Sequence, residues 1–106
     1  MPQEFSGVTV VIPANVYFGG QVTSRTVKFA DGSTKTLGVM LPGEYEFGTA
    51  KPELMEITAG RLGVQLAGET GWTEYAGGES FNVPGNSKFK VRPSEVTDYV
   101  CSFLDE

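Results

Sequence analysis

Residues Gly38 to Gly60 read GVMLPGEYEFGTAKPELMEITAG, and the interpretation of the whole chain starts from this stretch. Pro42-Gly43 separates a first strand-like run from the tetrapeptide Glu44-Tyr45-Glu46-Phe47. Successive side chains of a strand point to opposite faces, so the two glutamates share one face and the two aromatics share the other. This density of polar groups on a strand predicts that a binding site has its floor here.

Short apolar runs recur outward from this stretch in both directions, with turn residues between them. The expected strands cover residues 8–12, 16–22, 25–30, 34–41, 44–47, 53–58, 61–66, 72–75, 80–83, 87–91 and 96–103. Asp31-Gly32 and Ala59-Gly60 are typical of tight hairpin turns. No window shows the apolar period of a helix. The pattern predicts an all-β jelly roll or small barrel whose closure removes exposed sheet edges.

Length and composition exclude several classes of function. With 106 residues the chain is expected to form one domain, 1–106, in which residues 1–15 are an N-terminal extension carrying one strand. A net charge of −5 argues against nucleic acid as a partner. Apolar runs far shorter than roughly 20 residues argue against a membrane partner. Cys101 is the only cysteine, which fits a reducing, cytoplasmic location.

The chain contains no histidine, so the commonest general base and the commonest transition-metal ligand are both absent. Chemistry must come from carboxylates, hydroxyls, cations or backbone amides.

The spacing of glycines and acids in residues 38–60 resembles the first cupin motif, and residues 78–85 resemble the start of the second. Glu44 and Glu46 stand where cupins usually carry a pair of histidines, and Glu53 stands for the cupin glutamate after a longer gap. The second motif lacks its histidine. The resemblance therefore implies a cupin-like jelly-roll barrel (a double-stranded β-helix) without its usual metal.

A narrower resemblance covers most of the chain, from about residue 16 to 104. It is carried by residues 38–60, by GWTEYAGGESFNVPGNSKF (71–89) and by TDYVCSFL (97–104). Together they resemble the small single-domain pyrimidine/purine nucleoside phosphorylases. This implies that a nucleoside and inorganic phosphate react to give a free purine or pyrimidine base and a pentose 1-phosphate, without a cofactor. Small cupins usually dimerise, so the resemblance also implies a homodimer.

Glycosyl transfer to phosphate passes through an oxocarbenium-like state, which carboxylates stabilise. A carboxyl with a raised pKa can also protonate a departing base. By position in the cupin pattern, Glu44 and Glu46 point into the barrel and are the catalytic candidates. Residue type favours the opposite orientation, with Tyr45 and Phe47 in the core and both glutamates in solvent. The sequence leaves both orientations open.

Six further residues are candidates for substrate binding. Glu53 either binds the sugar or begins a strand and faces solvent. Thr49 either donates its hydroxyl to phosphate or sugar or only stabilises the turn in which it lies. Phe81, Phe89 and Tyr99 can stack on any base, although strand aromatics mostly belong to cores.

Ser87 represents a turn, residues 85–88, whose backbone amides can form an anion-binding nest for phosphate. Arg25, Lys28 and Lys35 on the first hairpin are alternatives to this turn.

Two other functions fit the same pattern. One is a non-enzymatic cupin that binds a sugar or nucleoside. The other is a metal cupin in which Glu44, Glu46 and Glu53 hold Mg²⁺ or Mn²⁺ through hard oxygen ligands. Phosphate-dependent release of a free base that survives a chelator distinguishes the phosphorylase from both.

Overall fold

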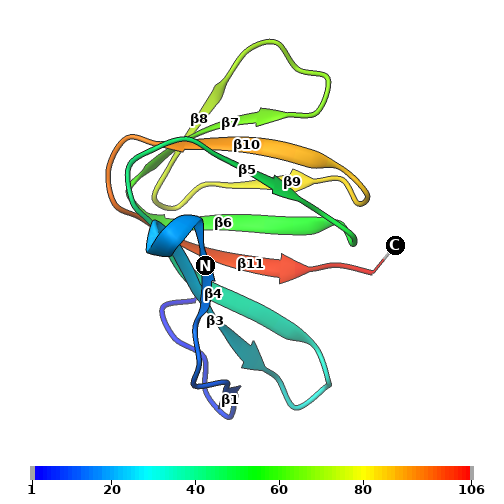
Figure 1. The fold of residues 1–106 in the computed structure, drawn as a ribbon. Helices are drawn as coiled ribbons and strands as arrows, with labels where there is room; N and C mark the ends of the chain where they lie inside the picture. The colour runs from blue at the N-terminus through cyan, green and yellow to red at the C-terminus, as the bar shows by residue number, and fades with distance from the viewer. Residues whose placement is uncertain (1, 106) are drawn as a thin grey trace.

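The computed structural model describes residues 2–105 and consists of two antiparallel β-sheets that face each other (Figure 1). The larger sheet has the strand order β1 (Thr9–Val10), β3 (Val22–Lys28), β4 (Thr34–Met40), β11 (Thr97–Phe103), β6 (Glu53–Ala59) and β9 (Ser80–Val83), and β2 (Asn15–Tyr17) also pairs with β3. The smaller sheet has the order β5 (Tyr45–Gly48), β10 (Lys88–Pro93), β7 (Arg61–Leu66) and β8 (Thr73–Ala76). The all-β jelly-roll prediction is confirmed, but the two sheets do not join into a closed barrel within the described residues.

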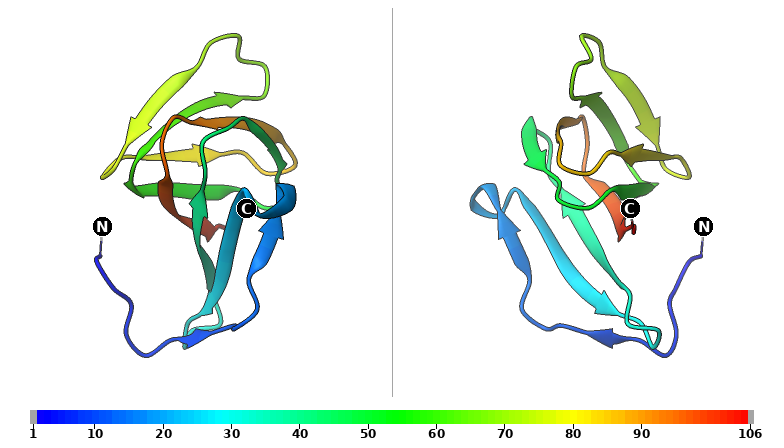
Figure 2. Two further views of the ribbon diagram at one scale, coloured as in Figure 1. Left: turned by 60° about the vertical axis from the view of Figure 1, so that its left-hand side comes forward. Right: turned by 90° about the vertical axis from the view of Figure 1, so that its right-hand side faces the viewer.

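The two views of Figure 2 show that the chain crosses repeatedly from one sheet to the other. The predicted hairpin at Asp31-Gly32 is confirmed, since β3 and β4 pair from Lys28↔Thr34 onward and Asp31 Oδ1 accepts hydrogen bonds from the Ser33 amide and hydroxyl. No helix within residues 2–105 is long and apolar enough to cross a membrane.

Two local predictions are wrong. The hairpin expected at Ala59-Gly60 is instead a corner between sheets, because β6 pairs with β11 and β9 while β7 pairs with β10 and β8. The single strand expected over 16–22 is interrupted by a short 3₁₀ turn, η1 (Phe18–Gly20). Phe18, Gly19 and Gly20 have φ of 52°, 65° and 99°, a left-handed course that ends a strand.

The core lies between the sheets and draws on both of them. Val22, Ile57 and Leu62 are at most 1% exposed, and Val91 is fully buried. On β7, Leu62 and Val64 face this core, as the alternation of residues 61–66 predicts. The expected N-terminal strand is present in a shorter form, since β1 pairs Thr9↔Lys28 along the free edge of β3.

The orientation of β5 is decided by its aromatic residues. Tyr45 is 7% exposed and belongs to the core cluster, and Phe47 packs against the same cluster. Glu44 and Glu46 are exposed, and Glu46 lies opposite Lys90 in the register of β5 and β10. Of the two orientations that the sequence left open, the structure therefore has the one with the aromatics inside, and the cupin-based alternative with both glutamates in the barrel is wrong. The physical reason is that burying the aromatic side chains stabilises a small core. Burying two carboxylates without partners would instead cost on the order of several kcal/mol each, because both charges would lose their hydration.

Gly38 on β4 lies under the ring of Tyr99, its register partner on β11. A Cβ at position 38 would lie 2.5 Å from Tyr99 Oη and 2.6 Å from the Thr23 carbonyl oxygen. The missing side chain lets Tyr99 lie across β4, and Ser24 on β3 continues the same cross-strand row. A residue without a side chain is therefore required here by packing and not by backbone conformation.

We expect Gly38→Ala to lower the free energy of unfolding by about 1 to 3 kcal/mol, because the added methyl overpacks against a ring and a backbone oxygen. The measurement is equilibrium denaturation in urea. Gly71→Ala is the matched control, since a Cβ there meets nothing within 4 Å, and it should change stability by less than about 0.5 kcal/mol. Equal effects of the two substitutions would contradict the packing role of Gly38.

Candidate active site

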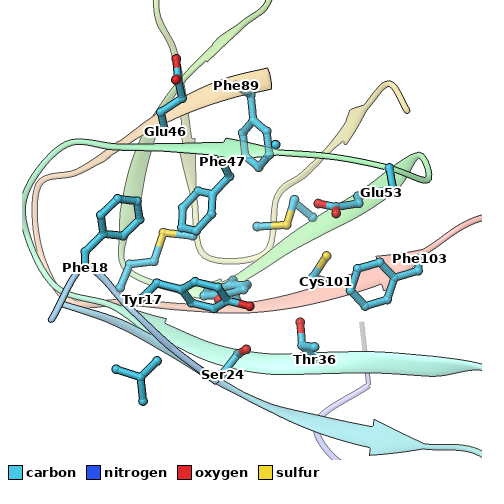
Figure 3. A pocket seen from close by; sticks show the side chains of 16 residues that line it. Tyr17, Phe18, Ser24, Thr36, Glu46, Phe47, Glu53, Phe89, Cys101 and Phe103 are labelled. Carbon is cyan, nitrogen blue, oxygen red and sulfur yellow. The ribbon is translucent and has the colours of Figure 1, made fainter. Parts of the chain in front are cut away.

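A cavity of about 750 Å³ lies between the two sheets and opens to solvent (Figure 3). Its volume falls within the usual range for small-molecule sites. Its walls are formed by Val16, Tyr17, Phe18, Ser24, Thr36, Met40, Glu46, Phe47, Gly48, Ala50, Glu53, Met55, Phe89, Tyr99, Cys101 and Phe103. These residues come from β2, η1, both sheets and the loop after β5, so the site forms only when the sheets face each other.

The floor of the cavity is polar and belongs to the larger sheet. Three neighbouring cross-strand rows build it. The first carries Ser24 and Tyr99, the second carries Thr36 and Cys101, and the third carries Glu53. Side chains of adjacent rows on one face lie within reach of one another. Hydroxyl, thiol and carboxyl groups are thereby brought to one surface.

The opposite wall is aromatic. Phe47 on β5 and Phe89 on β10 are register partners with ring centroids 5.9 Å apart. Phe18 and Tyr17 approach Phe47 edge-on at 5.4 and 5.8 Å. In Figure 3 Phe47 lies beside Tyr17 and Phe18 at one end of the cavity, Glu53 lies at the other end near Phe103, and Phe89 lies between them. The site therefore has an aromatic end and an acidic end.

Burial sets the protonation of the floor. Desolvation raises the pKa of Glu53, and a hydrogen bond with the Cys101 thiol partly opposes this. Desolvation also raises the pKa of Cys101, with a further contribution from the nearby Glu53 charge. The pKa of Tyr99 is raised for the same main reason. Tyr99 and Cys101 are therefore neutral hydrogen-bond donors at neutral pH, and a thiol held in this form is a poor nucleophile.

Four of the predicted site residues are among the lining residues: Glu53, Phe89 and Tyr99, with Glu46 at the rim. Phe81 does not line the cavity, because it is buried elsewhere in the core and stacks on Tyr75 at 4.7 Å. Glu44 lies on the surface outside the lining.

Glu46, Thr49 and Ser87 lie at the edge of the site. Glu46 is one of the lining residues, but its carboxylate points away from the cavity in Figure 3. The Thr49 hydroxyl donates to the Pro84 carbonyl at 2.7 Å and accepts from the Ser87 amide at 3.0 Å. Asn86 donates its amide to the Ala50 carbonyl at 3.0 Å. Two amides of the expected phosphate nest are thus already engaged, and these contacts join the loops 49–52 and 84–87.

Sequence reasoning missed Ser24, Thr36, Phe47 and the pair Tyr17 and Phe18. The alternation within β3 and β4 contained a partial signal, since Ser24 lies on the same face as the buried Val22. It did not reveal that β3 and β4 bring Ser24 and Thr36 onto the same face as Tyr99 and Cys101, because pairing between strands far apart in the sequence leaves no local pattern.

The metal alternative is not supported by the geometry. Within residues 2–105, no three His, Cys, Asp or Glu side chains converge as a metal site would require. Glu44 and Glu46 are on the surface while Glu53 faces the cavity, so the proposed trio of ligands does not come together.

A family model described as pyrimidine/purine nucleoside phosphorylase matches residues 12–103. The chain belongs to this family. A pyrimidine/purine nucleoside phosphorylase of Trichlorobacter lovleyi is 62% identical over 101 residues, covering 95% of this chain and 97% of that protein. One from a Sulfurovum species is also 62% identical, with 96% and 99% covered. The resemblance drawn from residues 38–60, 71–89 and 97–104 is confirmed.

Solved structures extend the comparison to the family's fold. A crystal structure of a protein of unknown function from an Acinetobacter species has a TM-score of 0.93 at 48% identity, covering 95% of this chain and 98% of that one. A cupin superfamily protein from Desulfitobacterium hafniense has a TM-score of 0.65 at 14% identity, with 89% and 84% covered, and shows the shared fold alone. The cupin-like fold class is thereby confirmed.

The raised pKa of Glu53 predicts a pH-dependent effect on stability. The folded protein holds the Glu53 proton more tightly than the unfolded chain does, so this stability is fully present below the ordinary pKa of 4.5. It is lost as pH rises through the higher pKa of the folded state. Glu53→Gln cannot ionise and escapes this loss.

The free energy of unfolding of Glu53→Gln relative to the wild type should therefore rise between about pH 4 and about pH 7, measured by urea denaturation. Glu56→Gln is the control, because Glu56 lies on the opposite face of β6. A difference between Glu53→Gln and wild type that stays constant with pH would exclude a buried, ionising Glu53.

Proposed function

We propose that this protein is a broad-specificity nucleoside phosphorylase that converts a nucleoside and inorganic phosphate into a free purine or pyrimidine base and a pentose 1-phosphate. The single observation that carries the proposal is one cavity with an aromatic end and a polar, acidic end. A nucleoside has the same division, with a flat base joined to a hydroxyl-rich sugar. Family membership agrees with this assignment.

The base is placed at the aromatic end. Phe47, Phe89, Tyr17 and Phe18 present ring faces and edges, and stacking on a ring does not depend on which base is bound. A wall built mainly of aromatic rings suits both purines and pyrimidines. The lining of the described cavity contains no Asn or Gln to read one base edge.

The sugar is placed over the polar floor. Tyr99, Ser24 and Thr36 carry hydroxyls that can donate to and accept from the ribose hydroxyls. In the reaction, a phosphate oxygen forms a bond to C1′ while the C1′–N bond breaks and its electron pair leaves with the base nitrogen. The Glu53 carboxylate lies where it stabilises the positive charge that develops on the sugar ring. The leaving base takes its proton from water or from a nearby donor.

Glu53→Gln should lower kcat for phosphorolysis by about a hundredfold or more, because one electrostatic stabiliser of the transition state is removed. The measurement is chromatography of free base released from inosine or uridine, with and without phosphate and with and without a chelator. Phosphate-dependent release that survives the chelator is expected from the wild type. If neither nucleoside releases base, the protein is a binding cupin and not a phosphorylase.

Glu44→Gln and Glu46→Gln test the residues singled out by the cupin pattern, whose catalytic role stays a prediction. We expect both to retain activity within about twofold, since their carboxylates lie outside the cavity. A hundredfold loss in Glu44→Gln with full activity in Glu53→Gln would reverse our assignment. Binding roles for Thr49, Ser87 and Phe81 also stay predictions, and alanine variants in the same assay decide them.

The proposal includes a homodimer and a cytoplasmic location. Large apolar side chains are exposed near the N-terminal edge, with Ile12 at 82%, Val16 at 62% and Phe18 at 48%. Such a group of exposed apolar residues is typical of an interface. Light scattering should give a molar mass twice that of the chain, and Val16→Asp should shift the measured mass toward that of a single chain. A monomeric wild type would contradict the dimer.

The single, reduced Cys101 agrees with the proposed cytoplasmic location.

A further inference from the structure

A phosphorylase needs a site for phosphate, and the cavity as described has an acid but no cation. None of the eight Lys and Arg residues is among the lining residues in the described part of the chain, while Glu53 is. Phosphate is bound in proteins mainly by charge-assisted hydrogen bonds from cations and by free backbone amides. The phosphate-binding cation must therefore reach in from just outside the lining. This inference rests on the proposed function.

Six of the eight cations are engaged elsewhere or project away from the acidic end. Arg25 donates to the Ile12 carbonyl, Lys35 lies 5.7 and 5.9 Å from the Phe5 and Phe29 ring centroids, and Arg92 stacks on Trp72 at 4.1 Å. Lys88 and Lys90 alternate with the buried Phe89 and therefore project from the outer face of β10. Arg61 follows the corner at Gly60. Lys28 lies at the same end of the larger sheet as Glu53, but β4 and β11 separate its strand from β6.

Lys51 is the cation that the chain places between two lining residues, at the mouth of the cavity. It follows Ala50 and precedes Glu53 by two residues, and both of these line the cavity. The backbone on either side is held, since the Ala50 carbonyl accepts from the Asn86 amide at 3.0 Å and the Pro52 carbonyl accepts from the Leu104 amide at 2.8 Å. The Lys51 side chain itself is 62% exposed. A mobile ammonium is thus carried on a fixed piece of backbone.

The partner of Lys51 comes from the end of the chain. Lys51 Nζ lies 3.7 Å from Asp105 Oδ1, and the Asp105 side chain is fully exposed. Asp105 follows Phe103, which lines the same end of the cavity as Glu53. A long and exposed ion pair of this kind contributes little to stability. It can be exchanged for a stronger anion at small cost.

We propose that Lys51 is the phosphate-binding residue and that Asp105 holds its ammonium at the mouth until phosphate takes its place. Phosphate then lies at the Glu53 end of the cavity and the base at the aromatic end, so the two are on opposite sides of the sugar, as in-line displacement at C1′ requires. The ammonium also offsets the repulsion between phosphate and the Glu53 carboxylate. No bond other than those of phosphorolysis is formed or broken.

Opposite effects of the two partners test this inference. Lys51→Gln should raise the KM for phosphate about tenfold or more, because one charge-assisted hydrogen bond to phosphate is lost. The KM for inosine should change little. Asp105→Asn should lower the KM for phosphate about twofold, because it removes both the competing anion and its repulsion. Lys51→Arg should recover most of the phosphate affinity. Lys90→Gln, the same charge change on the outer face of β10, should leave both KM values unchanged.

If the ion pair only fastens the chain end, Lys51→Gln and Asp105→Asn break the same contact and change activity alike, which would overturn the proposal. An unchanged phosphate KM in Lys51→Gln would overturn it too, while leaving the phosphorylase function intact. Calorimetric titration with inorganic phosphate tests the phosphate site separately from the phosphorylase reaction. Phosphate binding that is weakened by Lys51→Gln in a protein without turnover supports the phosphate site and contradicts only the proposed reaction.

Discussion

The central position of β11 is the constraint on which the rest of this structure depends. β11 pairs with β4 along one edge and with β6 along the other, so its alternation sets the inner face of the whole larger sheet. Tyr99 and Cys101 point inward from it, and Tyr99 can lie flat only because Gly38 has no side chain. The strand register then places Ser24 and Thr36 on the same face on one side of β11, and Glu53 on that face on the other side.

The two sheets divide the chemistry of the site between them. The larger sheet contributes hydroxyls, a thiol and one carboxyl, and the smaller sheet contributes phenylalanine rings. An apolar wall opposite a carboxyl lowers the local dielectric, which is why burial raises the pKa of Glu53. The same low dielectric strengthens the interaction of that carboxyl with a positive charge on a bound sugar. The low dielectric that packing creates therefore underlies both the raised pKa of Glu53 and the proposed stabilisation of the positive charge on the sugar.

Prediction from the sequence succeeded where the pattern is local and failed where contacts are distant. Strands such as β7 and β9 have the expected bounds because alternation and turn residues are visible in short windows. The corner at Gly60 was mistaken for a hairpin because a glycine with positive φ serves both, and only the pairing of β6 and β7 with different neighbours distinguishes them. Phe18 was not recognised as a strand end, since φ of 52° is unusual for a bulky residue.

The sequence by itself determined the all-β fold class, the family and the importance of residues 38–60, because these follow from alternation, turn chemistry and motif spacing. It also placed Glu53, Phe89 and Tyr99 among the candidates. Only the tertiary structure decided that Tyr45 and Phe47 face inward and that Glu44 and Glu46 face solvent. A strand with acids on one face and aromatics on the other fits either orientation until a second sheet covers one face. Here the covering sheet made the aromatic face the buried one, because apolar area gains free energy on burial and an unpaired carboxylate loses it.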